Sequence, residues 1–226
     1  MSVDDNITVI VINYCTPHLL PVVTDSFKQF YPTVYLILVD NGSKDGSRSE
    51  ITRLQEQHKA VGSIFINHNI YHGPAVNLAL RKTSTPYFFL LDSDCKVKKG
   101  GFLEKMSEHF HDDRVYAVGK VRYVQPTGVP VLPVQANRRE GIPYAETWGA
   151  LFHRERTAHL GEFARGGASG NRIAAAAYRQ HYRVVHFHVE EFIDHLGAGT
   201  RRMFNMSALP HHRQKPSKWS KGKRRF

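Results

Sequence analysis

Two aspartates separated by one serine, Asp92 and Asp94, are the residues whose type and spacing most directly suggest chemistry. They follow the apolar and aromatic run YFFLL at 87–91, so a buried strand would end where they begin. Two carboxylates at this spacing can reach one cation and a diphosphate bound to it, and Mg²⁺ and Mn²⁺ prefer carboxylate and phosphate oxygens. A lone Asp-x-Asp is common by chance, so its meaning depends on its surroundings.

Polar residues also follow three other apolar runs, which end near positions 13, 40 and 67. Because the carboxyl ends of parallel strands meet at one edge of a sheet, we expect these residues to line one crevice. Taken alone, the stretch VDNGS at 39–43 is simply a turn signal. The residues predicted to bind a ligand at this edge are Asn13, Tyr14, Asp40, Asn69, Asp92 and Ser93.

The elements that must position these residues alternate between two patterns. Strand-like runs at 7–13, 34–40, 63–67 and 87–94 are separated by helical patterns at 16–32, 43–60 and 73–83. Ser47 or Ser49 is a candidate N-cap for the second helix. This alternation predicts an α/β fold with a right-handed, parallel βαβ sheet and ligands beyond its carboxyl ends.

The second half of the chain is less regular. It contains a helical pattern at 101–111, a strand at 115–124, a Pro- and Gly-rich loop at 125–146, a strand at 147–154, a helix at 169–182 capped by Ser169, and an alternating run at 183–197. Long loops of this composition are often active-site lids or acceptor loops. We predict one domain over 1–204, with halves at 1–100 and 101–204, and a polar tail at 205–226.

Composition excludes several classes of protein. The chain is 41% hydrophobic, as in a globular protein, and no apolar run approaches the ~20 residues that span a bilayer. The first residues, MSVDDN, are acidic where a signal peptide needs basic residues, so we expect a cytoplasmic protein. Cys15 and Cys95 lack a Cys-x-x-Cys spacing, which argues against a disulfide framework or a zinc knuckle.

The net charge of +11 is concentrated at the end of the chain. Nine of the 31 Lys and Arg residues follow Asp194 and no acidic residue does, so residues 1–194 carry 22 basic against 20 acidic residues. The basic tail has three interpretations: a solvated end, a segment that lies on an anionic membrane surface, or one that neutralises nucleic-acid phosphates. The sequence does not separate them.

The order and spacing of these motifs resemble a known family. The strings TVIVINYCTPHLLPVVTDSFKQFYPTVYLILVDNGSKDGS and NHNIYHGPAVNLALRKTSTPYFFLLDSDCKVKKGGFLEKM are similar to family 2 nucleotide-sugar glycosyltransferases, which have the GT-A fold. Four elements appear in the family's order: a strand with Asn-Tyr, a Val-Asp-Asn-Gly-Ser turn, an Asn-x-x-x-Gly-x-x-x-Asn run, and an aspartate pair after an aromatic strand. The later string WGALFHRERTAHLGEF resembles the family's acceptor-side segment.

The resemblance implies a Rossmann-like, mostly parallel sheet, with a nucleotide-sugar-binding half at 1–100 and an acceptor half at 101–204. It implies that Asp40 contacts the base, that Asp92 contacts the ribose and a metal, and that Asp94 binds the metal that bridges the phosphates. Asn13 and Tyr14 would line the nucleotide pocket. His195 would lie near the diphosphate or the metal.

The implied activity is transfer of a sugar from a nucleoside-diphosphate sugar, first of all a UDP-sugar, to a hydroxyl acceptor, with Mn²⁺ or Mg²⁺ as cofactor. The acceptor would be a glycan, a lipid-linked saccharide, or a nucleic acid held by the basic tail. A lipid-linked acceptor would suit peripheral contact with an anionic membrane surface.

One departure from the family concerns the catalytic base. Inverting members carry an acidic pair where this chain has Ser169 and Gly170, and neither residue can accept a proton at neutral pH. Either another carboxylate serves, or the reaction retains configuration, or activity is lost. Glu146 is the preferred substitute, and Asp194, beside Glu190 and Glu191, is a second one.

Two other functions compete with glycosyl transfer. Nucleotidyl transfer to a sugar phosphate also uses an α/β sheet and a carboxylate-bound metal, but the stretch NYCTPHLL at 13–20 lacks the Gly-rich phosphate loop that it needs. A degenerate transferase fold could instead serve as a nucleic-acid-binding or scaffolding protein. The missing acidic pair and the basic tail motivate this alternative.

Overall fold

The computed structural model describes residues 3–125, 141–165 and 169–197. The chain divides into two units, Met1–His195 and Leu196–Phe226. The basic tail predicted at 205–226 lies outside the described residues. The elements below all belong to the first unit.

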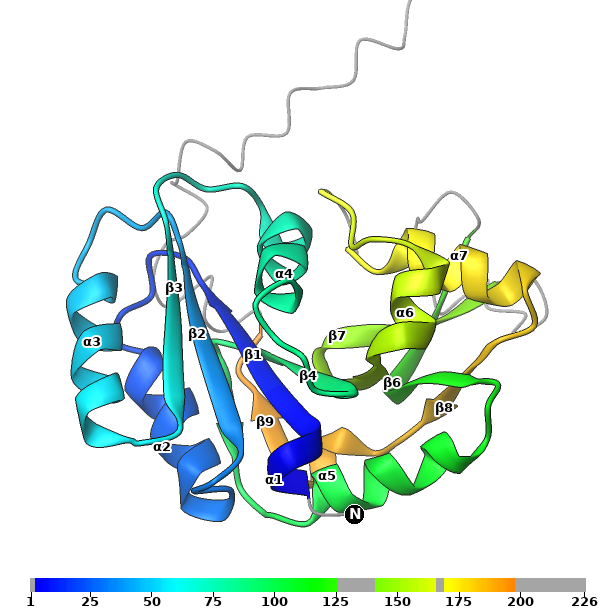
Figure 1. Ribbon diagram of the computed structural model, residues 1–226, viewed down its shortest axis with the longest axis horizontal. Helices are drawn as coiled ribbons and strands as arrows, with labels where there is room; N and C mark the ends of the chain where they lie inside the picture. The colour runs from blue at the N-terminus through cyan, green and yellow to red at the C-terminus, as the bar shows by residue number, and fades with distance from the viewer. Residues whose placement is uncertain (1–2, 126–140, 166–168, 198–226) are drawn as a thin grey trace, which may run out of the picture. The chain divides into compact units, whose positions relative to one another are not determined.

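The centre of this unit is a seven-stranded sheet, counted over the described residues, with the order β3-β2-β1-β4-β7-β6-β8 (Figure 1). Its strands are β1 (Ile7–Asn13), β2 (Tyr35–Asn41), β3 (Val61–Ile66), β4 (Tyr87–Asp92), β6 (Val115–Val124), β7 (Ile142–His153) and β8 (Arg183–His186). β1 to β4 pair in parallel, β7 runs antiparallel between β4 and β6, and β8 pairs in parallel with β6. The predicted α/β fold with a mostly parallel sheet is confirmed.

Helices cover both faces of this sheet (Figure 1). On one face lie α2 (Leu20–Phe30), α3 (Ser47–Gln57) and α5 (Phe102–Ser107), and on the other lie α4 (His72–Leu80), α6 (Arg154–Leu160) and α7 (Asn171–Arg179). Alternation along β4 divides its apolar run between the two cores. Phe89 and Leu91 pack with the first set of helices, and Phe88 and Leu90 pack with the second.

Smaller elements complete the fold. These are α1 (Val3–Asn6), the 3₁₀ helices η1 (Glu108–His111) and η2 (Val189–Glu191), and the short strands β5 (Cys95–Val97) and β9 (Ile193–His195). β5 and β9 pair antiparallel, with Cys95 opposite His195. This pairing returns the end of the described chain to the residues that follow β4.

The predicted elements in the second half needed correction. Residues 142–146 belong to β7, not to a loop, so Glu146 lies inside a strand, while 126–140 are outside the described residues. The alternating run at 183–197 is not one strand, because η2 interrupts it between β8 and β9. Glu190 and Glu191 therefore lie in η2, whereas Asp194 lies in β9.

The predicted helix caps were also wrong. Ser47 is the first residue of α3 and Ser49 lies inside it, while the N-cap residue is Gly46. The amide of Ser47 donates instead to Oδ1 of Asp45, at 2.9 Å. The N-cap of α7 is Gly170, and the hydroxyl of Ser169 contacts another helix, as described below.

Candidate active site

The register of the strands brings the predicted polar ends to one edge. Asn13 pairs with Asp40 across β1 and β2, and Ile12 pairs with Asp92 across β1 and β4. The ends of these three strands are therefore level. The sequence-based expectation of a shared edge agrees with this geometry.

Asp92, Asp94 and His195 form the centre of this edge. The Nε2 atom of His195 lies 3.6 Å from Oδ2 of Asp92 and 3.4 Å from Oδ1 of Asp94. Burial lowers the pKa of His195, but hydrogen bonds and charge from both aspartates outweigh that effect and raise this pKa to about 9. The two carboxylates thus create a position that favours positive charge.

The imidazole of His195 is held by a neighbouring strand. The ring of Trp148 in β7 stacks on it, with centroids 4.8 Å apart and planes inclined by 22°. The indole Nε1 of Trp148 donates to Oε2 of Glu146 at 3.1 Å, and Glu146 forms an ion pair with Arg122. Sequence analysis missed this support because it depends on the pairing of β6 with β7.

The donor set fits a hard divalent cation. One ligand atom from each of Asp94, Cys95 and His195 lies within 4.8 Å of the others. Burial is the main cause that raises the pKa of the Cys95 thiol well above its usual value, so its sulfur stays protonated and contacts the carbonyl of Trp148 at 3.5 Å. Asp94 and His195 then remain of this group, and together with Asp92, which lies beside His195, they form a set suited to Mn²⁺ or Mg²⁺.

Asn13 and Ser93 approach each other through a residue that sequence analysis did not select. The hydroxyl of Thr16 donates to Oδ1 of Asn13 at 2.7 Å and lies 3.5 Å from Oγ of Ser93. Asn13 is fully buried, and its Nδ2 atom has no hydrogen-bond partner among the described residues. Tyr14 is partly buried beside it. An unsatisfied buried amide next to the aspartates offers a donor to a ligand at this edge.

Asp40 is fully buried and both of its oxygens have partners. Oδ1 accepts from the amide of Ser43 at 3.3 Å, and Oδ2 accepts from Nε of Arg48 at 3.1 Å. Arg48 also donates to the carbonyl of Ile66 at 2.8 Å. Asp40 therefore holds the turn after β2 to α3 and β3, a role that the resemblance did not imply.

The turn after β2 and the segment after β3 form one network. Nδ2 of Asn41 donates to Oδ1 of Asn69 at 3.3 Å, and the amide of Tyr71 donates to the same oxygen at 2.8 Å. Gly42 adopts φ of +78°, and a Cβ there would lie 2.3 Å from the carbonyl carbon of His68. Asn69 thus fixes the entry to α4, rather than simply ending a strand.

His72 connects two sides of the edge and was not predicted. Its Nε2 atom lies 3.7 Å from Oδ1 of Asp92, and its Nδ1 atom lies 3.2 Å from Oγ of Ser169. Asp92 therefore has an imidazole beside each carboxylate oxygen, from His72 and from His195. No motif in the sequence signals this arrangement, since it requires Ser169, just before α7, to pack against the first residue of α4.

The two residues proposed as the base form ion pairs with different partners. Glu146, with 12% of its side chain exposed, is engaged by Arg122 and Trp148. Asp194, with 51% exposed, forms an ion pair with Nζ of Lys98 at 2.7 Å. Its catalytic role and that of Glu146 stay predictions.

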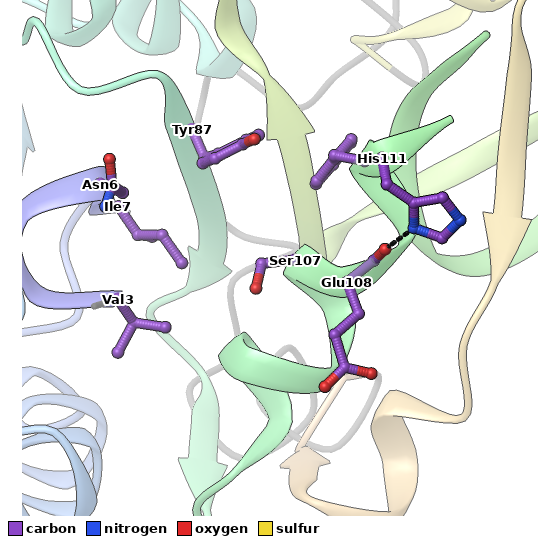
Figure 2. Close-up of a pocket in the computed structure, with 8 residues that line it drawn as sticks. Val3, Asn6, Ile7, Tyr87, Ser107, Glu108 and His111 are labelled. Atoms are coloured by element: carbon purple, nitrogen blue, oxygen red, sulfur yellow. Dashed lines mark hydrogen bonds between the residues drawn. The ribbon is translucent and has the colours of Figure 1, made fainter. Parts of the chain in front are cut away.

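A cavity of about 270 Å³ lies at the opposite edge of the sheet (Figure 2). It is lined by Val3, Asn6, Ile7, Tyr87, Ser107, Glu108, Phe110 and His111. Ile7 and Tyr87 begin β1 and β4, whereas the aspartates follow the end of β4. This cavity is therefore separate from the candidate active site. Figure 2 shows the hydrogen bond between the ring of His111 and the carbonyl of Glu108 at its rim.

The family model described as glycosyl transferase family 2 matches residues 8–176, from the second residue of β1 to a point within α7. This chain belongs to glycosyl transferase family 2. The membership predicted from the motifs at 7–106 is confirmed. The curated proteins contain no sequence match to this family 2 chain.

Solved structures share its GT-A fold. Mannosyltransferase PcManGT from Pyrobaculum calidifontis, in complex with GDP-Man and Mn²⁺, superposes with a TM-score of 0.64 at 21% identity, covering 80% of this chain. S. aureus TarS 1-349, in complex with UDP-GlcNAc, gives 0.61 at 16% identity, covering 85%. The family 2 chain spans only 54% and 61% of these two chains, respectively. Among its described residues no helix has the length and apolar character needed to cross a membrane.

Proposed function

We propose that this protein is a metal-dependent glycosyltransferase that moves a sugar from a nucleoside-diphosphate sugar to a hydroxyl acceptor. The observation that carries the proposal is the convergence of Asp92, Asp94 and His195 at the carboxyl edge of the parallel strands, in a chain of family 2. Ligands of open α/β sheets bind at this edge.

We propose UDP as the nucleotide of the donor and Mn²⁺ or Mg²⁺ as the cation. The two structural neighbours hold different donors, GDP-Man with Mn²⁺ in PcManGT and UDP-GlcNAc in TarS. Both nucleotides therefore belong in the test. The acceptor is a saccharide hydroxyl, on a glycan or a lipid-linked saccharide.

The residues at this edge would have different roles according to their positions. Asp92, Asp94 and His195 would hold the cation, which when bound stabilises negative charge on the leaving diphosphate. Asn13, whose Nδ2 atom has no partner among the described residues, would donate to the nucleotide. Asp40 would keep the turn after β2 in place through Arg48 and Ser43, so that the nucleoside meets a preformed surface.

Removal of the acceptor proton needs a base, for which Glu146 and Asp194 are the candidates. The ion pair with Arg122 keeps Glu146 close to Trp148, and hence on the side of β7 that faces His195. Asp194 follows the buried Ile193 and precedes His195, so regular alternation directs it away from that histidine. Glu146 is therefore the base that we propose first.

Calorimetry with UDP and with GDP, each in the presence of Mn²⁺, tests the proposal. We expect binding by the wild-type protein and at least a tenfold loss in Asp94→Asn, because a carboxylate bound to the cation is removed. Asp113→Asn is the matched control, since Asp113 is almost fully exposed and pairs with Arg156 away from the strand ends. Binding that is absent, or equal in Asp94→Asn and wild type, would refute the proposal.

Failure of that test would favour the degenerate-fold alternative. A protein that binds neither nucleotide, but is retained on DNA in a salt-dependent manner, would be a nucleic-acid-binding member of the fold. The basic tail that motivates this alternative lies outside the described residues. No described feature favours it over sugar transfer.

A further inference from the structure

Helix α4 and residues 163–165 are held together by buried hydrogen bonds and direct backbone contact. Nδ2 of Asn77 donates to the carbonyl of Phe163, and the amide of Phe163 donates to Oδ1 of Asn77, each at 3.0 Å. Asn77 is buried, so both hydrogen bonds are shielded from water. A Cβ on Gly73 would lie 2.0 Å from the carbonyl oxygen of Ala164, which shows that the two backbones are in direct contact.

These contacts between α4 and residues 163–165 bring Arg165 over the ring of Tyr71. The guanidinium carbon lies 4.3 Å from the centroid of the ring. Tyr71 is 45% exposed, and its backbone amide donates to Oδ1 of Asn69, which holds the backbone that carries the ring. The backbone on each side of the stack is therefore held in place, and both side chains remain accessible.

Among the described residues, Arg165 differs from the other arginine stacked on an aromatic ring in its ion pairing. Arg48 lies over Phe65 at 5.6 Å, but its guanidinium is paired with Asp40. The described residues place no carboxylate within ion-pair distance of Arg165, and its N–H donors lie in the plane of the group, away from the stacked face. A guanidinium that is held by stacking and has no acidic partner in this part of the chain is suited to a carboxylate or a phosphate.

The stack adjoins the reacting groups. His72 follows Tyr71 directly, lies 3.7 Å from Asp92, and contacts Ser169. The amide of Ala164, the neighbour of Arg165, donates to the carbonyl of Ser169 at 2.6 Å. The backbone on each side of the stack is therefore joined to the Asp92 site through His72 and Ser169.

We propose that Arg165, stacked on Tyr71, binds a carboxylate or phosphate carried by a saccharide substrate of this protein. The inference rests on the proposed function and adds a preference for anionic sugars. The anionic group belongs either to the donor sugar, as in a uronic acid, or to the acceptor, as in a sugar phosphate. Both share one chemistry, bidentate recognition by the guanidinium edge.

The experiment has a donor arm and an acceptor arm, each with a neutral twin. The donor arm compares UDP-glucuronate with UDP-glucose in the presence of Mn²⁺. The acceptor arm compares glucose 6-phosphate with glucose, with and without UDP and Mn²⁺. We expect the full-length protein to bind the anionic member of one pair at least about tenfold more tightly than its twin.

Variants then assign the preference to Arg165. Arg165→Gln should abolish it, and Arg165→Lys should retain only part, because a lysine lacks the planar fork. Arg179→Gln, at the exposed end of α7, removes the same charge and should leave the preference intact. Thermal unfolding of all three variants should match wild type, since Arg165 and Arg179 are both exposed.

The outcomes separate this inference from the proposed function. Equal binding of anionic and neutral twins in both arms, or equal loss in Arg165→Gln and Arg179→Gln, overturns the role of Arg165. Binding of UDP with Mn²⁺ is measured in the same titrations without any sugar. If UDP binds while no preference is found, only the inference fails, and if UDP does not bind, the proposed function fails.

Discussion

Replacement of Gly42 by alanine tests whether the turn after β2 is built against the segment after β3. Gly42 has φ of +78°, a conformation that costs an L-residue about 1–2 kcal/mol. A Cβ there would also lie 2.3 Å from the carbonyl carbon of His68 and 2.5 Å from the amide nitrogen of Asn69. These are backbone atoms that cannot rotate away, and overpacking of this kind costs about 1–3 kcal/mol more.

Gly101 supplies the matched control. It has φ of +83°, but nothing lies within 4 Å of a Cβ built on it, so Gly101→Ala isolates the cost of the backbone conformation. We expect urea denaturation to show a loss of about 1–2 kcal/mol for Gly101→Ala and about 2–5 kcal/mol for Gly42→Ala. UDP binding should weaken in Gly42→Ala alone, because the turn and Asn69 shift together. Equal destabilisation by the two variants would refute the reasoning.

Two further predictions concern charge. Burial lowers the pKa of Lys28 from 10.5 to about 8, although the charge of Asp4 opposes this shift. Between these two pH values the unfolded chain binds more protons than the native state does. The free energy of unfolding should therefore rise with pH from about 8 to 9.5. Urea denaturation at both pH values should show a smaller rise in Lys28→Met, and an equal rise would contradict the shift. If Glu146 is the base, Glu146→Gln should lower kcat for sugar transfer about 10²-fold or more while UDP binding is kept, and Asp194→Asn should change kcat little. The reverse result would assign the base to Asp194.

Much of the first half of the fold could be predicted from local pattern. β-branched and aromatic runs buried on both faces have few alternatives to parallel strands, and the helical patterns between them leave little freedom in topology. β1 was predicted with its observed bounds, and the predicted bounds of β2 to β4 differ from the observed ones by a few residues at most. The second half resisted prediction because β7 continues through residues that look like a loop, and because η2 interrupts a run whose alternation is that of one strand.

The residues of the candidate site also divide into those that the sequence predicted and those that it did not. Asn13, Asp40, Asn69 and Asp92 were predicted from the sequence because each lies at or just beyond the carboxyl end of a strand, and such ends share one edge of a parallel sheet. His72, Thr16 and Arg48 were missed, since each enters the site through contacts between elements distant in sequence. Such contacts depend on packing, for which local pattern carries no signal.

By itself, then, the sequence determined the parallel strands, the shared edge with its aspartate pair, and membership of family 2. Only the tertiary structure decided which groups surround that pair. The β5–β9 pairing places His195 opposite Cys95, and the contact between α4 and the segment before α7 places His72 against Asp92 and Arg165 over Tyr71. The physical reason is that strand periodicity is a property of neighbouring residues, whereas the partners of a charge are set by the folded packing of distant ones.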